Sequence, residues 1–472
     1  MTDISELSLS GGGLTVVATD VMLADVESLA SISAGLNTVL TKLAIADATM
    51  SETARSLTQV GWGRSRMDDA WAATTTAKDI CDYLGGQLVI AIENYTETEH
   101  NVEWLAMGVD ALAAFFFGKS LWITRDMLGP AGTILAAFLP WLVRGQFDGQ
   151  KDAIGARDLE APGWVNELAS DPQTIETVRR LVMQGDLFAT GLGPVPTAAA
   201  ALFSREGFTG AALSSHLLLL YAAQAGMLQE TNVSVTKTAS YERPGPITTT
   251  VDRLGAIPVA GDRADGAQIR IDEIHDGKRV RYEVFIAGTA DFNPISAGEP
   301  FDLTSNVAGV AGQSPASYRA VQLAMEQAGI TEASAVSFVG HSQGGLIASM
   351  LAASGDYNTQ GVTTIGAPAG QILIPPGVPA LLIEHYEDLV PALGGTQANT
   401  DALIVRRHAF SDEYPPDPTL SVPGHHLQYY LQTAELIDHA ESTVLQDTVA
   451  ELNEFSSGDS VTSTWYAAER VA

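Results

Sequence analysis

The sequence Gly340-His341-Ser342-Gln343-Gly344 has a glycine two positions before and two positions after its serine. An apolar run, residues 335–339, precedes it, and an apolar segment of helical character, residues 346–352, follows it. Strand, tight turn and helix in this order are what a nucleophile elbow requires. The glycines leave room for a strained turn that exposes Ser342. Because the five residues alone are a weak signal, the partners of the serine must carry the interpretation.

An acidic residue, Asp388, lies after Ser342 in the chain, in a loop that would follow a strand of a parallel sheet. Residues 361–366 and 378–383 are short apolar segments, each suited to a buried parallel strand. Asp388 comes just after the second segment, and Pro391 stops any further strand pairing. A carboxylate in this loop can orient a catalytic histidine, whereas the simpler alternative is a solvated turn residue. We expect Asp388 to be the acid of a triad.

Two adjacent histidines are candidates for the base. His425 and His426 follow a proline-rich loop and open a segment, residues 427–437, with apolar positions at helical spacing. A histidine at this junction can reach Ser342 while Asp388 orients its other ring nitrogen. His426 falls on the apolar face of the helix, whereas His425 precedes the helix. We therefore prefer His425 and keep His426 as the alternative.

Three other histidines are weaker candidates. His341 adjoins the nucleophile, but neighbouring residues of such a turn point to different sides, so we expect a structural role for it. His385 lies near the expected acid loop and His408 follows a strand-like segment, and neither has a helix junction to place it.

The chain from about residue 266 to residue 440 resembles a serine α/β-hydrolase, and within that group the class 3 lipases of filamentous fungi and plants. The elbow at 340–345 is similar to that of this family, and Asp388-Leu389-Val390-Pro391 resembles its Asp-x-Val-Pro acid loop. Residues 425–431 resemble the His-x-Leu-x-x-Tyr-Leu run of the plant members, which again favours His425.

An oxyanion hole is expected from two backbone positions. The amide of Gln343, directly after the nucleophile, can face a developing oxyanion. Gly288-Thr289 resembles the family's Gly-Ser/Thr oxyanion loop, and this resemblance implies that Thr289 joins Gln343 there. Ala287 is a departure, because the family usually has an arginine before the glycine.

The predicted fold is an α/β-hydrolase domain with a mostly parallel sheet over residues 267–472. Residues 268–274 and 279–286 alternate around a turn, which predicts a β-hairpin leading into that sheet. Residues 231–266 are rich in Thr, Pro and Gly and are interpreted as an extended connector. Residues 1–230 are expected to form an all-α helical region.

The helical region begins with two long amphipathic segments. Residues 15–48 and 67–100 have helical spacing, and the break near Gly61-Trp62-Gly63 suggests a helical hairpin. This hairpin resembles the WXG-type pairs of type VII secretion substrates in actinobacteria, and Tyr95-Thr96-Glu97-Thr98-Glu99 is similar to their export signal. The family's Trp-x-Gly spacing is absent, because Gly63 follows Trp62 directly.

Two more segments of this region are unusually apolar. Residues 104–117 and 127–143 are interpreted as buried helices of a bundle, and an apolar hairpin that touches lipid is the alternative. Further helices are expected at 174–184 and 211–229. The helical region is therefore where we expect contact with a membrane or with a secretion machinery, and where we expect any cap over the site.

Charge and cysteine content exclude several classes of protein. The formal net charge is −31, which opposes binding to phosphates, so we expect no nucleic-acid partner. Cys81 is the only cysteine, which excludes an intrachain disulfide and a multi-cysteine metal site. No phosphate-binding loop or metal-ligand cluster is evident, and we expect neither metal nor cofactor. Residues 1–6 lack the basic start of a Sec signal. Type VII-like export and cytoplasmic residence are both compatible with this sequence.

The expected chemistry follows from the three residues. Ser342 attacks an ester carbonyl, His425 takes its proton, and Asp388 holds the imidazole. We therefore expect a carboxylesterase or lipase that acts on apolar acyl esters through an acyl-enzyme. The alternative is a secreted effector or binding protein that uses the hydrolase fold as a scaffold without catalysis.

Overall fold

The computed structural model describes residues 7–11, 19–49, 68–85, 170–183 and 210–471, apart from a few positions within the third and last of these ranges. Several sequence predictions lie outside the described residues. These are the break at 61–63, the export-signal match at 95–99 and the apolar segments 104–117 and 127–143.

The chain divides into two compact units, which we describe separately. One comprises residues 17–126 and 187–205, and the other comprises residues 1–16, 127–186 and 206–472. The sheet belongs to the second unit, together with two helices from the region expected to be separate from it.

In the first unit, α1 (Thr19–Thr49) is followed by helical residues between 68 and 85. The Ser33 hydroxyl of α1 donates to Asp82 Oδ1 over 2.5 Å, which joins the two helical segments that the sequence predicts as a hairpin. Residues Ser28–Ala46 are long and apolar enough to cross a membrane, a property of length and composition that core helices of soluble proteins share.

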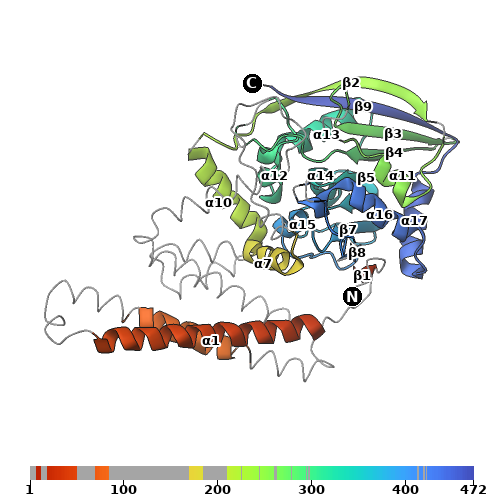
Figure 1. The fold of residues 1–472 in the computed structure, drawn as a ribbon. Coiled ribbons are helices and arrows are strands. Elements are labelled where there is room, and N and C mark those ends of the chain that lie inside the picture. Colours follow the sequence, from red (N-terminus) through yellow and green to blue (C-terminus); the bar gives the residue numbers. More distant parts are fainter. Residues whose placement is uncertain are drawn as a thin grey trace. The chain divides into compact units, whose positions relative to one another are not determined.

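A nine-stranded mixed sheet forms the centre of the second unit, in the order β1-β8-β7-β6-β5-β4-β3-β9-β2 within the described part of the chain (Figure 1). Strands β4 to β8 are parallel, whereas β1, β3, β9 and β2 each run antiparallel to their neighbours. The bounds are β1 Ser8–Gly11, β2 Asn232–Arg243, β3 Ile269–Asp276, β4 Arg279–Ile286, β5 Ala335–His341, β6 Asn358–Ile365, β7 Ala380–His385, β8 Leu403–Arg407 and β9 Ser460–Val471.

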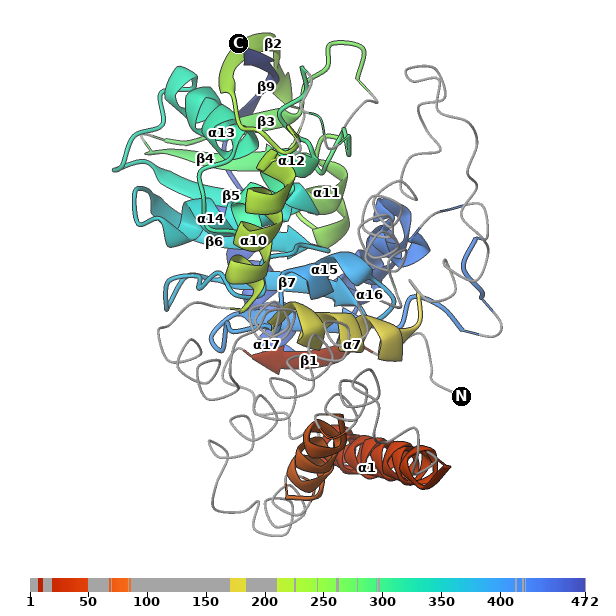
Figure 2. The ribbon, with the colours of Figure 1, turned by 90° about the vertical axis from the view of Figure 1, so that its left-hand side faces the viewer.

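Helices cover both faces of the sheet (Figure 2). Side chains alternate along each strand, so Val284 and Phe338 enter one apolar core while Phe285 and Val339 enter the other. The helices of this unit are α7 Pro172–Met183, α10 Gly210–Gln224, α11 Thr250–Gly255, α12 Leu303–Val310, α13 Ala316–Gln327, α14 Gln343–Ala353, α15 Leu389–Leu393, the 3-10 turn η2 Pro423–His425, α16 Leu427–Asp438 and α17 Thr443–Phe455. The mixed α/β class agrees with the sequence prediction.

The segment expected to be a connector is part of this packing. Within residues 231–266, β2 pairs along its length with β9, and α11 contributes the fully buried Leu254 to a core. β9 itself lies between β3 and β2, far from its neighbours in sequence. The predicted hairpin of 268–286 is present as β3 and β4.

A buried ion pair joins α11 to the sheet. Arg253 donates from Nε to Glu283 Oε1 over 3.2 Å, and its Nη2 donates to Leu452 O and Ser456 Oγ at 2.7 and 2.8 Å. The residue is 1% exposed, so the pairing is needed to offset the desolvation of the charge.

Glu299 is a partly buried carboxyl whose protonation is coupled to the stability of the fold. Burial raises its pKa to about 7, although Gln268 Nε2 and the Phe301 amide donate to it. The folded state therefore binds the proton more tightly than the unfolded state, so this contribution to stability is present below about pH 4.5 and is lost as pH rises through about 7.

Glu299→Gln is expected to remove this loss. In urea unfolding, the variant should gain about 2 kcal/mol relative to wild type at pH 8 compared with pH 5. Glu332→Gln, at an exposed glutamate, should show the same pH dependence as wild type. Equal pH dependence of Glu299→Gln and wild type would contradict the raised pKa.

Candidate active site

Ser342 occupies a strained turn between β5 and α14. Its backbone has φ 56° and ψ −122°, a region that serine rarely adopts. The turn is tight, since a Cβ added to Gly340 would lie 2.1 Å from the Gly344 carbonyl carbon, and one added to Gly344 would lie 2.1 Å from Ile286 O. The Ser342 amide donates to Ile365 O over 2.8 Å, which fixes the turn to β6.

His425 lies between Ser342 and Asp388. Its Nε2 is 2.8 Å from Ser342 Oγ, and its Nδ1 is 2.7 Å from Asp388 Oδ2. The serine and the histidine are each 5% exposed, and the aspartate is fully buried. Of the two adjacent histidines, His425 makes these bonds, while His426 is the N-cap position of α16.

Three groups bond to the Asp388 carboxylate: the His425 ring, the Tyr430 hydroxyl and the Val390 amide. Asp388 is the N-cap of α15 and accepts the Val390 amide at 2.9 Å, and Tyr430 donates its hydroxyl to Oδ2 over 2.7 Å. Burial alone would raise the pKa of Asp388, but the bonds from His425, Tyr430 and Val390 lower it overall. The carboxylate is thus kept ionised opposite the imidazole.

Gly366 lies against this group with φ +57°. A Cβ added there would lie 2.9 Å from Asp388 Oδ2 and 3.1 Å from both His425 Nδ1 and the Tyr430 hydroxyl, so only glycine leaves room for these three side chains.

Tyr430 lies in the segment 427–437 with apolar positions at helical spacing, and its hydroxyl also bonds to Asp388. Burial and the Asp388 charge raise the pKa of the phenol well above 10, so it stays protonated and donates. The His385 ring stacks on its ring at 3.8 Å between centroids.

Tyr430→Phe is expected to lower kcat for an ester substrate about tenfold with little change in KM, because one charge-assisted bond to Asp388 is lost while those from His425 and Val390 remain. Steady-state kinetics with a nitrophenyl ester would measure this. Tyr429→Phe, on the same helix, is the matched control and should keep wild-type kcat. An unchanged kcat in Tyr430→Phe would contradict a positioning role for the phenol.

The three weaker histidines hold neighbouring segments. His341 bonds through Nε2 to His425 O at 3.1 Å, and the two rings stack at 4.8 Å. Burial lowers the pKa of His341 to about 3 and that of His385 to about 4, so both are neutral. His385 contacts Gly424 O at 2.8 Å, and His408 contacts Glu387 at 2.7 Å.

The two expected oxyanion positions lie beside Ser342. A Cβ added to Gly288 would be 3.3 Å from Ser342 Cβ, so the loop that carries Thr289 adjoins the serine. Thr289 Oγ1 accepts from Asn306 Nδ2 at 2.8 Å. Gln343 opens α14, and its side chain donates to Asp302 O at 2.9 Å.

Helix α7 packs against the loops that carry Asp388 and His425. Its Ile175 forms an apolar cluster with Leu389, which follows Asp388 directly, and with Val422, which lies three residues before His425. Arg179 donates to Gly395 O over 3.0 Å. A helix from the region in which we expected a cap thus supports both loops.

Comparisons with known proteins add no further constraint on this site. No protein-family model, curated protein or solved structure matches the chain. Among the described residues, no group of three or more His, Cys, Asp and Glu side chains is arranged to hold a metal ion. The functional interpretation rests on the geometry of the chain itself.

Proposed function

We propose that the protein is a serine hydrolase of the α/β-hydrolase type that cleaves carboxylic esters with apolar acyl chains. The observation that carries the proposal is the continuous hydrogen-bonded series from Ser342 Oγ through His425 to the buried Asp388, with the serine in a strained turn at the end of a central strand. Buried polar groups in this order and spacing are costly to maintain, and nucleophilic catalysis gives a reason for them.

The reaction proceeds through an acyl-enzyme. Ser342 Oγ attacks the ester carbonyl as His425 Nε2 accepts its proton, and Asp388 stabilises the resulting imidazolium. The oxyanion takes hydrogen bonds from the amides of Gln343 and Thr289. His425 then protonates the leaving alcohol and activates the water that hydrolyses the acyl-enzyme.

Apolar packing around the triad favours an apolar acyl group. Leu346, three residues into the nucleophile helix, clusters with Ala367 and Ala369 beyond β6, and Ile175 of α7 packs beside Leu389. Burial of an acyl chain against apolar side chains favours binding by about 0.8 kcal/mol for each buried methylene.

A fluorophosphonate probe tests the proposal on the intact protein. Ser342 Oγ should displace fluoride from phosphorus and pass its proton to His425, which leaves a stable phosphonyl adduct. Peptide mass spectrometry should find this adduct on Ser342, and nitrophenyl esters should be turned over faster as the acyl chain lengthens from acetate.

Ser349→Ala is the matched control, because this buried serine lies on the same helix and its hydroxyl donates only to Gly345 O. The control should label like wild type. A folded wild type that takes no label would refute catalysis and favour a scaffold that binds a partner, and a sharp preference for short charged esters would refute the apolar acyl substrate.

A further inference from the structure

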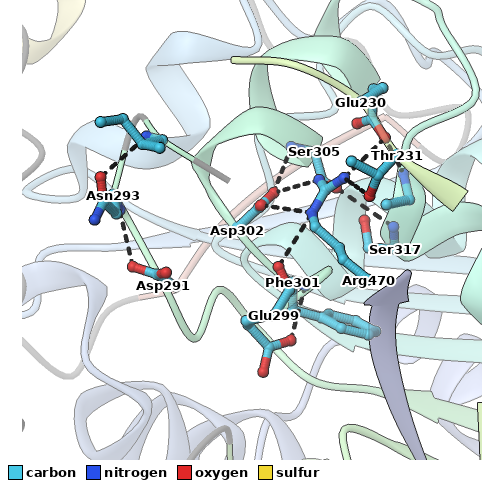
Figure 3. Close-up of polar contacts among 12 residues, drawn as sticks. Glu230, Thr231, Asp291, Asn293, Glu299, Phe301, Asp302, Ser305, Ser317 and Arg470 are labelled. Carbon is cyan, nitrogen blue, oxygen red and sulfur yellow. Dashed lines mark hydrogen bonds and ion pairs between the residues drawn. The ribbon is translucent and has the colours of Figure 1, made fainter. Parts of the chain in front are cut away.

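Arg470, near the end of β9, is the centre of a polar network (Figure 3). It donates two parallel hydrogen bonds to the Asp302 carboxylate, from Nε to Oδ2 and from Nη2 to Oδ1, each 2.9 Å long. Its Nη1 donates to Thr231 Oγ1 at 3.1 Å and to Glu230 Oε2 at 3.3 Å. The arginine side chain is 2% exposed and that of Asp302 is 1% exposed. Such a forked pair fixes both side chains in one orientation.

Asp302 connects Arg470 to Gln343, the first residue of α14. Its carboxylate caps α12 by accepting the Ser305 amide at 2.8 Å, and its backbone carbonyl accepts from Gln343 Nε2 at 2.9 Å. Gln343 is fully buried, and its backbone amide is the proposed oxyanion donor next to Ser342. The hydrogen bond from its side chain to Asp302 therefore restrains the residue whose backbone N–H must point at the oxyanion.

The same short segment also restrains the second oxyanion position. The amides of Ala290 and Asp291 donate to Phe301 O at 2.7 and 3.2 Å, and Leu303 donates back to Asp291 O at 2.9 Å. Through these bonds the loop that follows Thr289 is tied to the residues on either side of Asp302. Both proposed oxyanion donors are thus attached to one segment, and that segment is held by one guanidinium.

We propose that Arg470 is a positioning residue for the oxyanion hole, acting through Asp302 on Gln343 and on the Thr289 loop. The inference rests on the proposed function. Oxyanion donors contribute only when they are aimed at the charge that develops in the transition state, so small displacements of these amides reduce kcat more than substrate binding.

The test compares Arg470→Lys and Arg470→Met with Arg253→Met. Arg253 of α11 is the matched control, because its side chain is as buried as that of Arg470. It pairs with Glu283 of β4 and makes no bond to Asp302 or Gln343. For each protein, kcat and KM are measured with a nitrophenyl ester, and the inhibition constant is measured for a trifluoromethyl ketone of the same acyl chain, whose adduct carries the oxyanion.

Arg470→Met is expected to lower kcat about 30-fold and to weaken the trifluoromethyl ketone by a similar factor, with KM changed less than about threefold. Arg470→Lys should recover part of both losses, because it keeps the charge without the fork. Arg253→Met should lose thermal stability while its kcat and inhibition constant stay within about twofold of wild type. Wild-type kinetics in folded Arg470→Met, or equal kinetic losses in Arg253→Met, would overturn the inference.

Gln343→Met keeps the test decisive if Arg470→Met does not fold. This variant retains the backbone amide and removes only the side-chain bond to Asp302, so it should show the same selective loss of kcat and of ketone affinity. Combined with Arg470→Lys, the two losses should be less than additive, because both changes weaken one route. Fully additive losses would overturn the inference.

The outcome for wild type separates this inference from the proposed function. If wild type is neither labelled by the fluorophosphonate nor able to hydrolyse esters, both fail. If wild type is active and the variants are unaffected, only this inference fails.

Discussion

Replacing Ser342 with alanine is expected to lower kcat for an ester by about 10⁶-fold and to abolish fluorophosphonate labelling. In the proposed reaction Ser342 Oγ forms the acyl-enzyme and gives its proton to His425 Nε2, which lies 2.8 Å away. Binding should survive, because the alanine leaves the backbone amides that hold the oxyanion in place. Burst and steady-state kinetics with a nitrophenyl ester would measure the loss.

The stability of Ser342→Ala provides the control for this loss. Alanine must adopt the same φ of 56°, so the strain of the turn is retained and the melting temperature should stay near that of wild type. A melting temperature close to wild type together with undetectable turnover would assign the loss to the nucleophile. Retained turnover in the folded variant would exclude Ser342 from that role.

Asp388→Asn is expected to lower kcat by about 10⁴-fold while KM changes little. The ionised carboxylate accepts from His425 Nδ1 and from Tyr430, and so leaves Nε2 free to accept the serine proton. If the asparagine keeps its oxygen toward the Val390 amide, its NH₂ group faces the imidazole and donates to Nδ1. The proton then lies on Nε2, which is the wrong tautomer for a base.

Asp401→Asn is the matched control, because this aspartate is exposed and precedes β8 on the surface. It should retain wild-type kinetics. A fall in kcat of less than about tenfold in Asp388→Asn would show that the aspartate does not set the tautomer.

The central part of the fold could be predicted because its signals are local. The apolar runs in β5, β6 and β7 form parallel strands that are buried along β7, along the middle of β5 and along the last five residues of β6, and such strands leave continuous hydrophobic stretches in the sequence. The order of Ser342, Asp388 and His425 then followed from the ends of those strands. The choice of His425 over His426 depended on one junction residue, and the geometry places its ring between the other two.

The outer part of the sheet could not be predicted, because its strands depend on partners that are remote in the sequence. β2 is half exposed and carries Ser, Thr and Lys among its apolar residues, so its alternation is too weak to distinguish an edge strand from a connector. β1 has only four residues and acquires its structure by pairing with β8, almost the whole chain away. Tyr430 and Arg470 were missed because a tyrosine at helical spacing and an arginine in a strand give no sign in the sequence of the partners they meet.

The pairing of β2 with β9 determines when the sheet can be completed during synthesis of the chain. β9 is translated after every other strand described here, yet it lies between β3 and β2, so β2 has no partner until that late segment emerges. At ribosomal rates of about 5–20 residues per second, β2 remains an open edge for many seconds and can pair with other nascent chains. Arg470 lies on the same late strand, so the network that it forms with Asp302, Thr231 and Glu230 assembles only after that strand has been made. Under the proposed function, we expect the nascent chain to be inactive until β9 has been translated.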